Sequence, residues 1–303
     1  MTTAITYDRY GGPDVLEVSE VDSVDPGPGE VQLEVRAAGV NLIDAKLRRG
    51  DLAHVFRPEF PVVPGIEVAG TVTAVGADVD GVTIGDDVFG VAAYGGYTQV
   101  AIASSFHLKP KSVGWEMAAA LPIVGEAACR TLGHLGVQPG ERLLIQGAAG
   151  SVGTIATQLA LARGITVVGV AREDDLDLVH SRGAVAVAYG DGLVARVREL
   201  FPDGVDAVLD TAGAGVLPDS IELAGGPERV ITIADESGPQ LGVRFTGPDP
   251  TDRDRTALAK LADLAAAGKL ELPIWRRYPL ANARSAHEDL DAGRTRGKIV
   301  LIP

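Results

Sequence analysis

The feature that most constrains the fold is a glycine-rich turn between a strand and a helix. Residues 143–146 are typical of a buried strand, Gly-Ala-Ala-Gly-Ser-Val-Gly follows, and residues 151–164 have the apolar period of an amphipathic helix. Such a turn exposes backbone N–H groups at the positive end of a helix dipole, where a pyrophosphate binds. We therefore predict a cofactor-binding turn made of Gly147, Ala148, Ala149, Gly150, Ser151, Val152 and Gly153. A purely structural turn is the alternative.

Strand and helix patterns alternate through this part of the chain. The apolar runs are RLLIQG, ITVVGVA, AVAVAY, VDAVLD, RVITIA and LGVRF. Alternation of this kind produces a parallel sheet with helices on both faces, and six strands make a complete dinucleotide-binding domain. We predict an α/β fold with a Rossmann doubly wound parallel six-stranded sheet over residues 122–265.

The rest of the chain has a β-rich pattern. Short runs separated by glycine and proline turns fill residues 1–105, and the only clear helical period there begins at Asn41 and ends at Gly50. The closing segments, LELPIWRRYPL and KIVLIP, have the same character. We predict a mostly β substrate lobe built from residues 1–121 and 266–303.

Composition excludes several classes of protein. The 27 Lys and Arg residues against 41 Asp and Glu give a net charge of −14, which opposes binding to nucleic acid or anionic lipid. The single cysteine, Cys129, excludes an internal disulfide and favours a reducing compartment. The first residues lack the pattern of an export signal, and no apolar run is long enough to span a membrane. We expect a cytoplasmic protein.

Arg172 follows the second strand pattern, at the position that distinguishes the two nicotinamide dinucleotides. NAD is usually held there by an acid, whereas NADP needs the acid absent and a cation nearby. The guanidinium has a planar fork of donors that matches a 2′-phosphate. Glu173 is the argument for NAD(H), but the arginine favours NADP(H) as the cofactor.

Nine stretches, in order along the chain, carry a family resemblance. They are YGGPDVLEV, AAGVNLIDAKLRRG, PVVPGIEVAGTVTAVG, GDDVFG, GGYTQVAIA, ALPIVGEAA, QPGERLLIQGAAGSVG, DTAG and GRTRGKIVL. With them the chain resembles the medium-chain dehydrogenase/reductase superfamily, specifically its zinc-independent, zeta-crystallin-like quinone oxidoreductase branch. The resemblance implies a GroES-like substrate lobe and NADPH-dependent transfer of hydride to a small-molecule quinone or α,β-unsaturated carbonyl. It also implies a homodimer paired through the edge strand 241–245.

The resemblance implies that no metal takes part. Zinc alcohol dehydrogenases of the superfamily have cysteine where this chain has Asn41 and histidine where it has Ile66, beside the retained Glu67. Both ligands are missing, so zinc cannot polarise a substrate oxygen here. Glu67 is then expected to be structural.

The resemblance also assigns site residues. Relatives place Asn41 and Asp44 near nicotinamide and substrate. Asn41 would donate its amide to a substrate carbonyl oxygen, although it is also suited to cap the following helix. Asp44 is expected to orient the backbone and the cofactor ribose, in preference to acting as a base. The remaining cofactor contacts are expected at Arg172, Tyr189 and Arg294 for the 2′-phosphate, and at Asp210 and Ile233 at strand ends.

Two departures limit the assignment. Relatives have Leu-Thr after Gly125, whereas this chain has Glu126-Ala127, so Glu126 either alters the pocket or points to solvent. No tyrosine closely follows Gly50, which disfavours reduction of acyl thioesters. A pathway-specific enone reductase and a non-catalytic NADPH-binding redox sensor or structural protein are the other readings.

Overall fold

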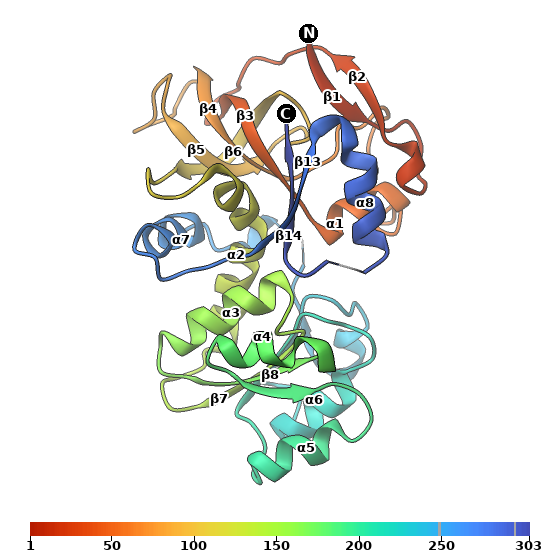
Figure 1. The fold of residues 1–303 in the computed structure, drawn as a ribbon, viewed down its shortest axis with the longest axis vertical. Coiled ribbons are helices and arrows are strands. Elements are labelled where there is room, and N and C mark those ends of the chain that lie inside the picture. The colour runs from red at the N-terminus through yellow and green to blue at the C-terminus, as the bar shows by residue number, and fades with distance from the viewer. Residues whose placement is uncertain (248–249, 294) are drawn as a thin grey trace. The chain divides into compact units, whose positions relative to one another are not determined.

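The computed structural model describes residues 1–247, 250–293 and 295–303 (Figure 1). The chain divides into two compact units. The first consists of residues 1–123 and 258–303, and the second of residues 124–257. No helix in the described part of the chain is both long and apolar enough to span a membrane.

The first unit is built on a sheet with the order β13-β14-β3-β4-β5-β6. Its strands are β3 (Val31–Val40), β4 (Glu67–Val75), β5 (Asp87–Ala92), β6 (Val100–Leu108), β13 (Ile274–Pro279) and β14 (Lys298–Ile302). Strand β3 pairs with both β4 and β6, so β3 to β6 close into a ring. Strand β14 lies antiparallel to β3, which confirms the predicted return of the C-terminal segment. A separate antiparallel pair joins β1 (Thr2–Thr6) and β2 (Glu17–Val21).

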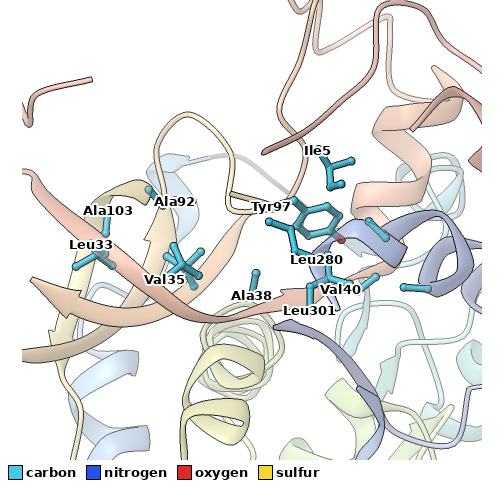
Figure 2. Close-up of a cluster of buried hydrophobic side chains, with 14 of the residues drawn as sticks. Ile5, Leu33, Val35, Ala38, Val40, Ala92, Tyr97, Ala103, Leu280 and Leu301 are labelled. Carbon is cyan, nitrogen blue, oxygen red and sulfur yellow. The ribbon is translucent and has the colours of Figure 1, made fainter. Parts of the chain in front are cut away.

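The apolar core of this unit draws on distant parts of the sequence. Alternate residues of β3 point inward, because successive side chains of a strand face opposite sides of a sheet. Figure 2 shows Leu33 and Val35 of this strand in one cluster with Ile5, Leu280 and Leu301. The core therefore needs both ends of the chain. Tyr97 lies in the same cluster and brings a polar hydroxyl group into it.

Helices α1 (Leu42–Arg49), α7 (Ala257–Ala266) and α8 (Ala283–Asp291) accompany these strands, with short 3-10 turns η1 (Pro13–Val15) and η5 (Leu280–Asn282). Helix α1 begins after Asn41 and ends at Gly50, whose φ of 84° lies in the left-handed region that favours glycine. Both bounds are as predicted from the sequence. Helix α8 contacts α1.

The second unit is a parallel sheet with the order β12-β11-β10-β7-β8-β9. The strands are β7 (Arg142–Gln146), β8 (Thr166–Ala171), β9 (Val185–Ala188), β10 (Ala207–Asp210), β11 (Val230–Thr232) and β12 (Arg244–Phe245). The connecting elements are α3 (Ser151–Leu161), η2 (Glu173–Asp175), α4 (Leu176–Ser181), α5 (Leu193–Leu200), α6 (Leu217–Ala224), η3 (Gly238–Leu241) and η4 (Pro250–Asp252). The predicted six-stranded Rossmann sheet is confirmed, although the last strand has only two residues.

Two features differ from the sequence-based expectation. Helix α2 (Trp115–Leu135) was not predicted, and the division between the two units falls within it, after Ile123. The second division falls at residue 257, whereas the sequence placed it at 265, because helix α7 packs almost entirely with the first unit. A helical period shows that a segment has an apolar face, but not which core that face covers.

Candidate functional site

The glycine-rich turn has the geometry that a pyrophosphate requires. Gly147 has a φ of 78° and opens the turn directly after β7. A Cβ on Gly153 would lie 2.3 Å from the Gly147 carbonyl oxygen, so only glycine allows this close approach of helix α3 to the turn. The sequence motif is thus explained by backbone conformation and packing.

Backbone donors are left over at the start of α3. The first N–H groups of a helix have no intrahelical partner, and no side chain caps this one. Gly150 N donates to Gly147 O, whereas the N–H groups of Ser151, Val152 and Gly153 have no hydrogen-bond partner in the described residues. Free donors at the positive end of an eleven-residue helix fit the pyrophosphate of a dinucleotide.

The predicted 2′-phosphate residues lie at the ends of β8 and β9. Arg172 follows β8, and its Nε donates to Asp175 Oδ2 at 2.8 Å while its side chain is 53% exposed. Asp175 is buried, so it anchors one edge of the guanidinium and leaves the rest open to solvent. Tyr189 N donates to Ala171 O at 2.9 Å, which brings this exposed tyrosine beside Arg172. Arg294 lies outside the described residues.

Asp210 and Ile233 lie together where β10 and β11 end. The Asp210 carboxylate accepts hydrogen bonds from the N–H groups of Ala212 and Gly213, both at 2.9 Å, and from the Thr232 hydroxyl at 2.7 Å. Ile233 N donates to Asp210 O at 3.0 Å. Burial raises the pKa of Asp210 against these hydrogen bonds. The carboxylate therefore shapes this turn, and a direct cofactor contact by Asp210 or Ile233 stays a prediction.

Asn41 and Asp44 lie together at the start of α1 in the first unit. Asp44 Oδ2 accepts from the Asn41 backbone N–H at 2.8 Å, and Asp44 N donates to Asn41 O at 3.0 Å. The two residues thus fix the first turn of the helix, as a capping pair does. The Asn41 side chain also reaches beyond the helix, to residues of two neighbouring strands.

Those residues are Glu67, the first of β4, and Lys298, the first of β14. Asn41 Nδ2 donates to Glu67 Oε1 at 2.8 Å, and Lys298 Nζ donates to Asn41 Oδ1 at 2.6 Å and to Glu67 Oε1 at 2.5 Å. Glu67 Oε2 accepts from the Ile123 N–H at 2.9 Å. Gly39 permits the approach, because a Cβ there would lie 2.1 Å from Glu67 Oε1. Strands β14, β3 and β4 are neighbours, so their ends place this cluster.

A second set of hydrogen bonds reaches Asp44 from the other direction. Tyr97 OH donates to Asp44 Oδ2 at 3.1 Å, and Tyr97 lies 3.2 Å from His287 Nε2. Arg48 Nη1 lies 2.9 Å from His287 Nδ1. Because a guanidinium only donates, Nδ1 must accept, and the proton of neutral His287 is on Nε2, facing Tyr97. Arg48 Nη2 is paired with Asp291 at 2.5 Å.

Burial sets the protonation of this chain of residues. Desolvation raises the pKa of Asp44 to about 7, and the Asn41 N–H lowers it only in part. Desolvation, aided by the Arg48 charge, lowers the pKa of His287 to about 3 and keeps the ring neutral. Burial also raises the pKa of Tyr97 well above its ordinary value, so its hydroxyl remains a donor. Asp44 Oδ1 is buried and has no hydrogen-bond partner in the described residues.

Glu126 does not point to solvent. It is 9% exposed, and its Oε1 accepts from Arg130 Nε at 2.9 Å and from Asp254 N at 3.0 Å. Arg130 also donates to the Thr246 hydroxyl. Glu126 and Arg130 therefore tie helix α2 to residues on either side of position 250, and the solvent-facing alternative is wrong.

Sequence reasoning missed several polar residues of the site. Lys298, Tyr97, His287 and Arg48 were not singled out, and Glu67 was expected to be merely structural. In the sequence, Lys298 and Glu67 each begin an apolar strand, but only the structure shows that each is 3% exposed or less and that they are paired. Charged residues are almost never that buried unless they are paired.

Comparisons with known proteins agree with this architecture. Residues 27–128 match the alcohol dehydrogenase GroES-like domain, and residues 182–301 match a zinc-binding dehydrogenase domain. The chain is 32% identical to quinone oxidoreductase from Sus scrofa, over 100% of this chain and 98% of that protein. It is 32% identical to 2-methylene-furan-3-one reductase from Solanum lycopersicum, over 99% of this chain and 79% of that protein.

Among solved structures, Escherichia coli quinone oxidoreductase in complex with NADPH superimposes with a TM-score of 0.87. It is 28% identical, and the match covers 99% of this chain and 100% of that one. A Rossmann sheet joined to a β lobe of this topology defines the medium-chain dehydrogenase/reductase class. The chain belongs to that superfamily, in its quinone oxidoreductase branch, and it is an oxidoreductase.

Proposed function

We propose that the protein is an NADPH-dependent oxidoreductase that transfers hydride to a quinone or an α,β-unsaturated carbonyl compound without a metal ion. The observation that carries the proposal is the row of unbonded N–H groups at Ser151, Val152 and Gly153, with an exposed arginine at the end of the next strand. The relatives named quinone oxidoreductase, one of them solved with NADPH, support it.

The second unit is proposed to bind the phosphate groups of the cofactor. The amides of the turn from Gly147 to Gly153 hold the pyrophosphate, and the open edge of Arg172, with Tyr189 beside it, holds the 2′-phosphate. Arg294, which belongs to the C-terminal segment and not to the second unit, is proposed as a further contact on the resemblance alone. When bound, NADPH supplies the hydride and leaves as NADP⁺, while the substrate gains two electrons and takes its balancing proton from water.

Asn41 and Asp44 are the proposed site residues of the first unit. As hydride arrives, negative charge develops on the substrate oxygen, and an amide N–H of Asn41 stabilises that charge without itself titrating. Asp44 holds the backbone N–H of Asn41 and thereby fixes the residue at the start of α1.

The Lys298 ammonium supports independence from metal. It donates to Asn41 Oδ1 and to Glu67 Oε1. By the resemblance, Asn41 stands at the position of one metal ligand of the zinc relatives, and Glu67 follows the position of the other. A fixed positive charge bonded to these oxygens repels a second cation and occupies the acceptors that a metal would need. Dialysis against a chelator is therefore expected to leave turnover unchanged, and a loss restored by zinc would exclude this part of the proposal.

An enone reductase specific for one substrate is the second candidate, favoured by the similarity to 2-methylene-furan-3-one reductase. The test is a panel of quinones, enones and alkenals with NADPH and NADH, combined with calorimetry of both cofactors. We expect tighter binding of NADPH and turnover of a quinone or an enone. Binding without turnover of any acceptor would favour the non-catalytic sensor, and no binding of either cofactor would exclude the proposal.

We also propose a cytoplasmic homodimer. The single cysteine, Cys129, is compatible with a reducing compartment. Strand β12 lies at one end of the second unit's sheet, so it has an edge at which a second copy can pair. Light scattering on the purified protein tests the dimer, and a monomeric mass at micromolar concentration would exclude it.

A further inference from the structure

The side-chain amide of Asn41 has two ends that differ in chemistry, and its neighbours decide which end faces where. Lys298 Nζ lies 2.6 Å from one end and can only donate, so that end must be the oxygen. Glu67 Oε1 lies 2.8 Å from the other end and is an acceptor when ionised, so that end must be the NH₂ group. The pair allows only one of the two amide orientations.

The pair that imposes this orientation is costly to bury. Lys298 and Glu67 are 3% and 0% exposed in their side chains. Removing two charges from water costs several kcal/mol per ion, about as much as their attraction returns, so a buried pair is weak evidence for a contribution to stability. Its hydrogen bonds to Asn41 point to a positioning role.

One donor of the amide is left over. The NH₂ group has two hydrogens, and Glu67 takes one of them. No other acceptor in the described residues bonds to Asn41 Nδ2. Asn41 is 7% exposed, compared with 3% for Lys298 and 0% for Glu67, so it is the most exposed member of the cluster.

We propose that Lys298 is a positioning residue, which holds the Asn41 amide so that an N–H group and not the carbonyl oxygen is offered to the substrate oxygen. This inference rests on the proposed function. The ammonium on Oδ1 also draws electron density from the amide, which strengthens the remaining N–H as a donor. Once the Glu67 carboxylate is also replaced, loss of Lys298 leaves the amide free to turn and present its oxygen, which repels a developing negative charge.

The test is a double-mutant cycle in a background from which the carboxylate charge has been removed. Every protein in the cycle carries Glu67→Gln, so that replacing Lys298 does not leave a buried carboxylate without its partner. The effect of Lys298→Met is then measured once with Asn41 present and once in Asn41→Ala. We expect Lys298→Met to lower kcat about tenfold when Asn41 is present, less than the roughly 10²-fold or greater loss for deleting an oxyanion donor. KM and the Kd for NADPH should change less than twofold, and Lys111→Met is the matched surface control.

The cycle separates positioning from mere structure. In the Asn41→Ala background, Lys298→Met should change kcat less than twofold, because there is no amide left to orient. An equal fall in kcat in both backgrounds would show that Lys298 acts through general structure and would overturn the proposal.

A measurement on the wild-type protein tests the orientation of Asn41 even if the variants do not fold. Nitrogen-15 NMR should detect a coupling across the hydrogen bond from Lys298 Nζ to the Asn41 side-chain carbonyl carbon. The absence of this coupling, with the ammonium signal observed, would overturn the inference without any activity measurement. Loss of turnover with every acceptor in the wild-type protein would instead reject the proposed function, and the NMR result would still judge the orientation of Asn41.

Discussion

Replacing Tyr97 with phenylalanine removes a single hydroxyl group from the buried cluster around Asp44. That hydroxyl donates to Asp44 Oδ2 at 3.1 Å and lies 3.2 Å from His287. The ring remains to fill the same apolar core, so the change acts on the hydrogen bonds alone. The expected consequence is a further rise in the pKa of Asp44.

The size of the rise follows from the two forms of the carboxyl group. A hydrogen bond to a charged group contributes about 1.5–3 kcal/mol, and one to a neutral group about 0.5–1.5 kcal/mol. The ionised form of Asp44 therefore loses about 1 to 1.5 kcal/mol more than the protonated form. Because one pKa unit corresponds to about 1.36 kcal/mol, the pKa of Asp44 should rise from about 7 by about one unit.

The assay is a carbon-13 NMR titration of the Asp44 carboxyl group, identified by its disappearance in Asp44→Asn. Tyr94→Phe is the control, because Tyr94 is 62% exposed on the same unit. A pKa for Asp44 in Tyr97→Phe that is unchanged or lower would refute the reasoning, since it would mean that the hydroxyl does not stabilise the carboxylate.

The free energy of unfolding should depend on pH through the titration of Asp44. Burial raises the folded-state pKa of Asp44 above its unfolded value, so the folded chain binds this proton more tightly. The contribution of Asp44 is then fully present below about pH 4 and is lost as the pH rises through about 7. In Tyr97→Phe the loss should continue about one unit higher, and a urea-denaturation series from pH 4 to 9 on both proteins checks it.

Three further variants test the second unit. Arg172→Ala should weaken NADPH binding about 10- to 100-fold and leave NADH unchanged, because only NADPH has the phosphate; calorimetry with both cofactors measures this. Gly153→Ala should weaken the binding of NADPH and NADH to the same extent, since the new Cβ would lie 2.3 Å from the Gly147 carbonyl oxygen. Affinities for both cofactors that match those of the wild-type protein would contradict the packing argument. Arg130→Met should destabilise by about 3–5 kcal/mol by leaving Glu126 unpaired, and Arg130→Met with Glu126→Leu should recover most of the loss in urea denaturation.

Local patterns in the sequence were enough to predict the Rossmann sheet and the mostly β character of the first unit. The period of two in β3 and the glycine turn after β7 are written in consecutive residues, and backbone chemistry alone gives them one conformation. The same reasoning missed α2, because Pro122 in an alanine-rich run is typical of a break, and the helix forms nonetheless.

Local patterns could not predict the cluster of Asn41, Glu67 and Lys298. Glu67 and Lys298 are 231 positions apart, and only the pairing of β14 and β4 on either side of β3 brings them together. Glu126 was different: Arg130 stands four residues later, the spacing of an ion pair on one helix face, and that signal was available. It was overlooked because the helix itself was not predicted.

The return of the C-terminal strand has a consequence for synthesis. Every residue of the second unit leaves the ribosome before Lys298 does, and growing chains fold from the N-terminal side first. A nascent chain that ends before β14 already contains the complete phosphate-binding turn. It lacks Lys298, whose ammonium is the only one that contacts Glu67 in the described structure. The β lobe is therefore the part of the chain that is completed last, and we expect it to be the part of a folding intermediate that chaperones and proteases recognise.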